Sequence, residues 1–187
     1  MALTAAQILA LIQNAGGVLK AVSTIADEFN QLFGSVEDVH NKVRWLEISI
    51  VNLSTEQTLY IDKSWFDSGR FWAQPFDGIA PGSAQTFFVC NSDGSIFTGV
   101  SGGVSYKVVK SSSQSKFTEG SKERLICTFS NPYAGATKCL TRWMKNDISS
   151  LFGEMEESAI VRDERCGCYR AGNNKVVFIW KDKSSHW

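Results

Sequence analysis

Residues 2–39 carry the pattern that most restricts how this chain can fold, because they lack proline and repeat their apolar residues at helical spacing. Three rows of apolar residues, each with a spacing of seven, lie on one face of such a helix. The first row is Ile8, Ala15, Val22, Phe29 and Val36, the second is Leu11, Val18, Ile25 and Leu32, and the third, beside them, is Ile12, Leu19, Ala26 and Phe33. Thr4 is a suitable N-cap and Gly34 a suitable end. The pattern predicts one amphipathic helix about 45 Å long, which exceeds the hydrocarbon thickness of a bilayer.

The first half of this predicted helix has no ionisable side chain, since none occurs from Met1 to Leu19. Lys20, Asp27 and Glu28 come only afterwards. A charged residue at the bilayer centre costs about 2.5–3.5 kcal/mol, so the first half is the part that a membrane would accept. No basic region precedes it, and we interpret it as part of the working protein, not as a signal peptide. Periodicity alone leaves two alternatives level: membrane insertion, and packing on a core or another helix.

After Asn41 the spacing of the apolar residues changes from the helical period to a period of two. The change begins where Val43, Trp45, Glu47, Ser49 and Val51 alternate with Arg44, Leu46, Ile48 and Ile50. Further strands are predicted at residues 57–62, 84–90, 95–99, 103–110, 124–129 and 174–181, and short helices near 135–145 and over 148–158. Many short strands between frequent turns are typical of a sandwich or barrel. We therefore expect a mainly β protein: a β-sandwich over residues 42–187, flanked by two helices, one of them the long amphipathic helix and connector over residues 1–41.

Composition narrows the function classes. The 19 basic and 19 acidic residues cancel, which argues against nucleic acid and against a purely electrostatic attachment to anionic lipid. The five cysteines are an odd number, so we expect free or partly paired thiols: Cys90, Cys127, Cys139, Cys166 and Cys168. With two histidines and cysteines in a spacing too tight for a zinc knuckle, no metal and no cofactor are expected.

The sequence also argues against catalysis. The segment Gly99-Val-Ser-Gly-Gly superficially matches a nucleophile elbow, but the strand–elbow–helix order is missing around it. Neither His40 nor His186 stands in a motif that serves catalysis. We expect that the chain is not an enzyme.

Three segments in order give the chain a resemblance to the actinoporins, the α-pore-forming cytolysins of sea anemones with relatives in molluscs, fish and mosses. The segments are Trp65-Phe-Asp-Ser-Gly, Phe97-Thr-Gly-Val-Ser-Gly-Gly-Val-Ser-Tyr-Lys-Val and Leu125-Ile-Cys-Thr-Phe-Ser-Asn-Pro-Tyr. With the amphipathic start, the resemblance covers nearly the whole chain.

The resemblance implies a secreted, membrane-attacking toxin that is monomeric in solution. Its sandwich would bind sphingomyelin or another phosphocholine lipid, and the N-terminal helix would then detach and insert. Several copies would form a homo-oligomeric, cation-permeable pore in the target-cell membrane. The inserting residues would be Leu3, Ile8, Leu11, Ile12, Ala15, Val18, Leu19 and Val22.

Carried over by position, the resemblance also implies a headgroup site. Its residues would be Ser68, Ser101, Ser130, Pro132 and Tyr133, with Trp143 as a membrane anchor. Apart from the resemblance, the interfacial preference of tryptophan suggests Trp72, on the neighbouring turn, as a second anchor. Where the family has a loop rich in tyrosine and tryptophan, this chain has Ala134-Gly-Ala-Thr-Lys-Cys-Leu-Thr-Arg-Trp143, and the helix at 151 has no tyrosine. Lys138, which we add to the predicted headgroup site, or Arg142 would then favour a phosphate or another headgroup. The alternative is a non-lytic lectin-like or lipid-binding β-sandwich, which would not need an uncharged segment of nineteen residues before it.

Overall fold

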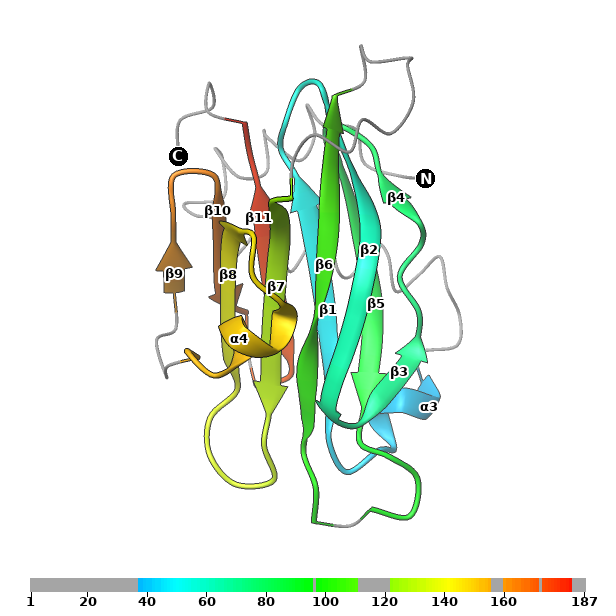
Figure 1. The fold of residues 1–187 in the computed structure, drawn as a ribbon. Helices are drawn as coiled ribbons and strands as arrows, with labels where there is room; N and C mark the ends of the chain where they lie inside the picture. The colour runs from blue at the N-terminus through cyan, green and yellow to red at the C-terminus, as the bar shows by residue number, and fades with distance from the viewer. Residues whose placement is uncertain (1–36, 96, 111–121, 156–159, 172, 183–187) are drawn as a thin grey trace.

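The computed structural model describes residues 37–95, 97–110, 122–155, 160–171 and 173–182 (Figure 1). The predicted amphipathic helix, with all eight of its proposed inserting residues, lies outside the described residues. The described chain is mainly β and forms two sheets, as the period of two predicts. In the described part, no helix has the length and apolarity needed to cross a bilayer.

The first sheet has six strands in the order β3-β5-β1-β11-β10-β9. Their bounds are β1 (Trp45–Asn52), β3 (Arg70–Ala73), β5 (Ser83–Cys90), β9 (Ile160–Arg162), β10 (Cys166–Arg170) and β11 (Lys175–Trp180). β1 and β11 pair in parallel, although they are far apart in the sequence, and the other pairs are antiparallel. This parallel pair places the C-terminal strand in the middle of the sheet.

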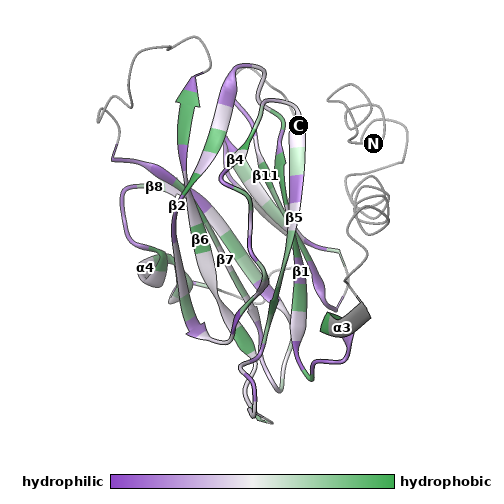
Figure 2. Cartoon of the chain, turned by 90° about the vertical axis from the view of Figure 1, so that its right-hand side faces the viewer, coloured by the Kyte–Doolittle hydropathy of each residue, from purple (hydrophilic) through white to green (hydrophobic). Residues whose placement is uncertain are grey.

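The second sheet has five strands in the order β4-β2-β6-β7-β8, and all of its pairs are antiparallel. Its strands are β2 (Gln57–Ser68), β4 (Gly78–Ile79), β6 (Val100–Lys110), β7 (Arg124–Asn131) and β8 (Lys138–Met144). Figure 2 shows the two sheets as separate layers. We call the end of the sandwich where β7 finishes and β8 begins the β7–β8 end.

The core lies between the two sheets. Side chains that alternate along each strand are fully buried there, among them Ile48, Val104, Phe129 and Phe178. The alternate positions face outward, as expected for strands with a side-chain period of two. On the six-stranded sheet a second apolar cluster forms in this way from Val51, Tyr169, Val177 and Ile179.

Two short helices flank the sandwich on opposite outer faces (Figure 2). α3 (Glu37–His40) falls within the predicted connector, and its Val39 is buried against Phe88 and Cys90. α4 (Ile148–Phe152) buries Ile148 and Leu151 on the five-stranded sheet. The predicted helix over residues 148–158 is thus helical for five residues in the described part.

Two sequence predictions are wrong. The segment predicted as a helix near 135–145 is a loop followed by β8. In β8 the side chain of Cys139 is buried in the core, and that of its neighbour Leu140 is buried under α4. Burial on both faces removes the simple alternation that identifies a strand. The segment 95–99 is not a strand in its described residues but a loop that leads into β6, and Phe97 within it is 74% exposed.

Candidate functional site

The predicted headgroup residues come together at the β7–β8 end. Ser68 pairs with Ser101, Ser101 with Ser130, and Ser130 with Lys138, so the four form one register row across β2, β6, β7 and β8. Directly paired residues point to the same side of a sheet, and this side is the outer face on which α4 also lies. We call these four residues the serine row.

Hydrogen bonds fix two of the serine hydroxyls. Ser68 Oγ donates to the carbonyl oxygen of Gly99 at 2.9 Å, and Ser101 Oγ donates to Asp67 Oδ2 at 3.0 Å. A hydroxyl that donates one hydrogen bond still has lone pairs that accept others. Ser101 is only 7% exposed, whereas Ser130 and Lys138 are half-buried, so access is wider on the β7–β8 side of the row.

A close backbone contact joins the start of β6 to the end of β7. A Cβ added at Gly99 would lie 2.5 Å from the carbonyl oxygen of Asn131 and 2.6 Å from the Cα of Pro132. Glycine is therefore required where the chain enters the serine row, and Pro132 is held beside the row by its backbone.

Tyr133 follows Pro132 and, together with Phe97, forms the exposed aromatic surface of this end. Its side chain is 43% exposed, and its ring packs edge-on against the ring of Phe97, with 5.4 Å between centroids. The guanidinium of Arg44 lies 5.5 Å from the same ring, in cation–π contact. Tyr133 is the one tyrosine beside the serine row. Tyr60 and Tyr106 lie further along β2 and β6, and Tyr169 lies on β10 of the other sheet.

The two predicted anchors lie outside the serine row. Trp72, on β3, packs against the α3 cluster, and Lys42 Nζ and Arg70 Cζ lie 5.3 and 5.5 Å from its ring. Both cations also pair with Asp93, whose pKa is lowered, first by the hydrogen bond from Lys42 and then by the charges of both. Trp72 therefore lies between an apolar cluster and two cations.

Trp143 is five residues further along β8 than Lys138, or about 17 Å at a strand rise of 3.3–3.4 Å per residue. Its ring packs on Trp180, and its Nε1–H donates to Glu123 at 2.9 Å. Arg142, the other predicted phosphate ligand, forms an ion pair with Glu154 beyond α4. The structure thus brings neither Trp143 nor Arg142 to the serine row.

A second glycine allows α4 to lie directly on the sheet. A Cβ at Gly103 would come within 2.5 Å of Ile148 Cγ2 and 2.7 Å of the Cys127 carbonyl oxygen. Trp65 supports the helix from β2 by an edge contact with Phe152. Gly103 and Ile148 thus separate the serine row from a basic cavity on the other side of α4.

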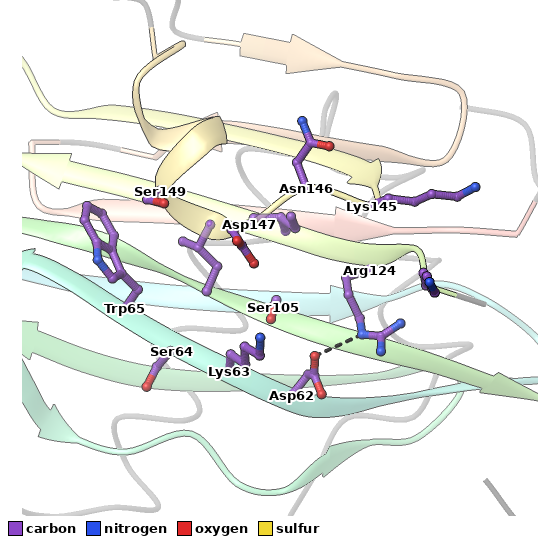
Figure 3. Close-up of a pocket in the computed structure, with 13 residues that line it drawn as sticks. Asp62, Lys63, Ser64, Trp65, Ser105, Arg124, Lys145, Asn146, Asp147 and Ser149 are labelled. Atoms are coloured by element: carbon purple, nitrogen blue, oxygen red, sulfur yellow. Dashed lines mark hydrogen bonds and ion pairs between the residues drawn. The ribbon is translucent and has the colours of Figure 1, made fainter. Parts of the chain in front are cut away.

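This basic cavity beside α4 has a volume of about 370 Å³ (Figure 3). Its charged lining residues are Asp62, Lys63, Lys122, Arg124, Lys145 and Asp147. Asp62 Oδ2 accepts a hydrogen bond from Arg124 Nε at 2.9 Å, and its Oδ1 lies 2.8 Å from Lys107 Nζ. Burial raises the pKa of Asp62, but the hydrogen bonds and charges of these two cations outweigh burial, so the pKa is lower than usual. Part of the positive charge here is therefore neutralised within the protein.

The five cysteines are all buried and form no disulfide. Burial raises the pKa of the Cys166 thiol to about 12 and that of Cys127 still further, which suppresses the reactive thiolate. Among the residues that the structure describes, no group of histidine, cysteine or acidic side chains is arranged to hold a metal ion.

Sequence reasoning did not select Arg44, Asp67 or Phe97 as site residues. Arg44 stands before a strand in the sequence and is brought to Tyr133 only by the packing of the two sheets. Phe97 belongs to a motif that resembles the family, but its exposure depends on the loop conformation. No local signal in the sequence identifies such residues.

Comparison with known proteins shows the fold. No protein family and no curated protein matches the sequence. The solved structure of the lipid binding protein Nakanori is similar over 97% of this chain and 88% of that chain, with a TM-score of 0.63 and 10% identity. The likeness is compatible with the actinoporin resemblance but does not single out that family.

Two further solved structures are more distant. IP-1A from Alcaligenes faecalis has a TM-score of 0.45 and 13% identity over 80% of this chain and 99% of that chain. The RahU protein, in complex with a TRIS molecule, has a TM-score of 0.43 and 13% identity over 77% of this chain and 98% of that chain.

Proposed function

We propose that this protein binds membrane lipid at the β7–β8 end and then forms a pore with its N-terminal helix. The observation that carries the proposal is the serine row, because residues 68, 101, 130 and 138, chosen from the sequence, lie side by side on neighbouring strands. The similarity in fold to a structure described as a lipid binding protein supports the same function.

The chemistry of the row suits a phosphate-bearing headgroup. The hydroxyl of Ser130 can donate to a phosphate oxygen, whereas those of Ser68 and Ser101 donate within the protein and can accept from a donor of the lipid. The ammonium of Lys138 supplies a positive charge for the phosphate. Phe97 and Tyr133 would enter the interfacial region, where aromatic rings are favoured. We propose sphingomyelin, or another phosphocholine lipid, as the ligand of this row.

The amphipathic helix supplies the second half of the function. We propose that its apolar stripe rests on the outer cluster of the six-stranded sheet, formed by Val51, Tyr169, Val177 and Ile179, which are at most 2% exposed. Lipid binding would then favour the state in which the stripe enters the bilayer, since a ligand shifts a population by its differential affinity. Such a protein would be secreted as a monomer and would oligomerise on a target membrane.

The test compares binding and dye release on vesicles of phosphatidylcholine with and without sphingomyelin. We expect binding and leakage, both stronger when sphingomyelin is present. Absence of binding to every vesicle would overturn the proposal. Binding without leakage would retain the lipid site and support the non-lytic module instead.

A pair of variants tests the helix. Leu11→Glu places a charge within the apolar stripe, and we expect retained binding but leakage reduced at least tenfold, because a charge at bilayer depth costs about 2.5–3.5 kcal/mol. Gln13→Glu adds the same charge on the polar face and serves as the matched control. Equal leakage from the two variants would contradict insertion of this segment.

A further inference from the structure

A second pocket opens at the β7–β8 end, on the side of the six-stranded sheet. It has a volume of about 560 Å³ and is lined by residues that precede β1, follow β7, precede β8 and form the β10–β11 turn. Arg44 and Arg170 are its charged lining residues, and no carboxylate is among the described residues that line it. We call it the arginine pocket.

Each arginine is held by a backbone carbonyl. Arg44 Nη2 donates to the carbonyl oxygen of Tyr133 at 2.5 Å, and Arg170 Nη1 donates to that of Thr137 at 2.9 Å. Neither forms an ion pair with any residue in the described ranges, and the Nε of Arg44 is buried without a hydrogen-bond partner there. A guanidinium has five N–H donors, so most of the donor capacity in the pocket is still available for a ligand.

The walls of the pocket are fixed by an amide network. Asn131 Nδ2 donates to the Trp45 carbonyl oxygen at 2.9 Å and to Asn174 Oδ1 at 3.2 Å. The hydroxyl of Thr137 donates to the backbone carbonyl of Asn173. These bonds join the loops of both sheets, so the two guanidinium groups are positioned before any ligand arrives.

Tyr133 lies between the arginine pocket and the exposed rings that we propose face the membrane. Its ring is already engaged by Arg44 and Phe97, which limits its use as an aromatic cage for a quaternary ammonium. Ser130 and Lys138 of the serine row are the sequence neighbours of Asn131 and Thr137, and successive strand residues point to opposite faces, so the two sites lie on either side of the five-stranded sheet at the same end. A bilayer lying across this end of the sandwich would reach both sites. The charges here therefore favour phosphate over choline.

We propose that Arg44 and Arg170 form a second lipid site that binds a net anionic, phosphate-bearing headgroup. The planar guanidinium fork matches a phosphate by paired hydrogen bonds, which an ammonium does not reproduce. The inference rests on the proposed membrane binding of this end and adds a lipid class that the serine row does not require. A neutral chain would thus gain affinity for anionic membranes through one local site.

The test measures vesicle binding to phosphatidylcholine with sphingomyelin, with and without added phosphatidic acid. We expect phosphatidic acid to raise the vesicle affinity of the natural protein. We expect Arg170→Gln to reduce this gain in affinity about tenfold. Arg170→Lys retains the charge but should restore only part of the gain. Arg142→Gln is the matched control, because Glu154 already neutralises that arginine.

The outcomes separate the two proposals. If the natural protein binds sphingomyelin vesicles but gains nothing from phosphatidic acid, or if Arg170→Gln and Arg142→Gln behave alike, the second site is overturned and the proposed function stands. If no vesicle binds, both are overturned. Arg44→Gln repeats the test from the other wall, with circular dichroism to confirm that each variant is folded.

Inorganic phosphate distinguishes a lipid site from a site for a free anion. We expect millimolar phosphate to compete weakly with phosphatidic acid vesicles, since the membrane also offers the serine row and the exposed rings. A rise in melting temperature with phosphate that depends on Arg170, without any Arg170 effect on vesicles, would overturn the lipid assignment.

Discussion

Two groups of basic side chains differ in how their charge is balanced. Beside α4, Asp62 accepts contacts from both Arg124 and Lys107, so these charges belong to an internal network. At the β7–β8 end, Arg44 and Arg170 contact carbonyl oxygens, and within the described part of the chain no carboxylate lines their pocket. An internally paired charge is expected to contribute to stability, whereas a charge held only by neutral acceptors attracts an external anion.

The largest effect is expected from Gly99→Ala, which tests whether the β7–β8 end depends on its backbone contact. The added Cβ would meet backbone atoms of Asn131 and Pro132 at 2.5 and 2.6 Å, and backbone cannot move aside as a flexible side chain does. We expect a loss of about 2–4 kcal/mol in the free energy of unfolding, together with weaker vesicle binding. Urea unfolding and vesicle co-sedimentation measure the two quantities.

Gly153→Ala is its control beyond α4. Gly153 has an ordinary helical φ of −64°, and its added Cβ would lie no closer than 3.7 Å to any neighbour. We expect its stability to change by less than about 0.5 kcal/mol. A Gly99→Ala protein as stable as Gly153→Ala would show that the two segments are not in the close contact described.

The next effect sharpens the contrast between the two basic groups. Asp62→Asn should lower the free energy of unfolding by about 1–3 kcal/mol, since it leaves Arg124 and Lys107 side by side without their carboxylate. Its vesicle binding should remain that of the natural protein. Arg170→Gln should show the opposite balance, with a smaller loss of stability and a larger loss of binding to anionic vesicles. Weaker vesicle binding by Asp62→Asn would break the distinction.

A smaller effect is expected at the exposed rings. Phe97→Ala and Tyr133→Ala should each weaken vesicle binding about threefold to tenfold, in line with the interfacial preference of aromatic rings. Phe76→Ala is the matched control, because Phe76 is 60% exposed but lies in the segment before β4. Equal affinities of the Phe97 and Phe76 variants would argue against the β7–β8 end as the membrane-facing end.

The sequence predicted most of the sandwich because alternation follows burial wherever one strand face meets the core. The predictions at 57–62, 84–90, 124–129 and 174–181 correspond to β2, β5, β7 and β11, and the long run of β2 was predicted too short. Prediction failed at β8, where Leu140 is buried under α4 while its neighbour Cys139 is buried in the core. A local pattern does not reveal a helix that covers the outer face.

The serine row was predictable for a different reason than the arginine pocket. Short motifs around Ser68, Ser101 and Ser130 resemble a family whose site is built at those positions, and strand pairing then aligned them. Arg44 and Arg170 are separated by most of the chain, and only the parallel placement of β11 beside β1 brings their loops together. A pocket between two sheets depends on the topology, which residue spacing does not encode.

The smallest effect concerns pH and again separates the two groups. Because the folded pKa of Asp62 is below its unfolded value of about 3.9, its contribution to stability is present above that value. The contribution is lost as the pH falls through the lower, folded pKa, since protonation then removes the charge from both states. We therefore expect the stability difference between the natural protein and Asp62→Asn to be constant near neutral pH and to shrink below about pH 4. Urea unfolding from pH 6 to pH 3 measures it, and a difference that persists unchanged at pH 3 would mean that packing, and not charge, accounts for the role of Asp62.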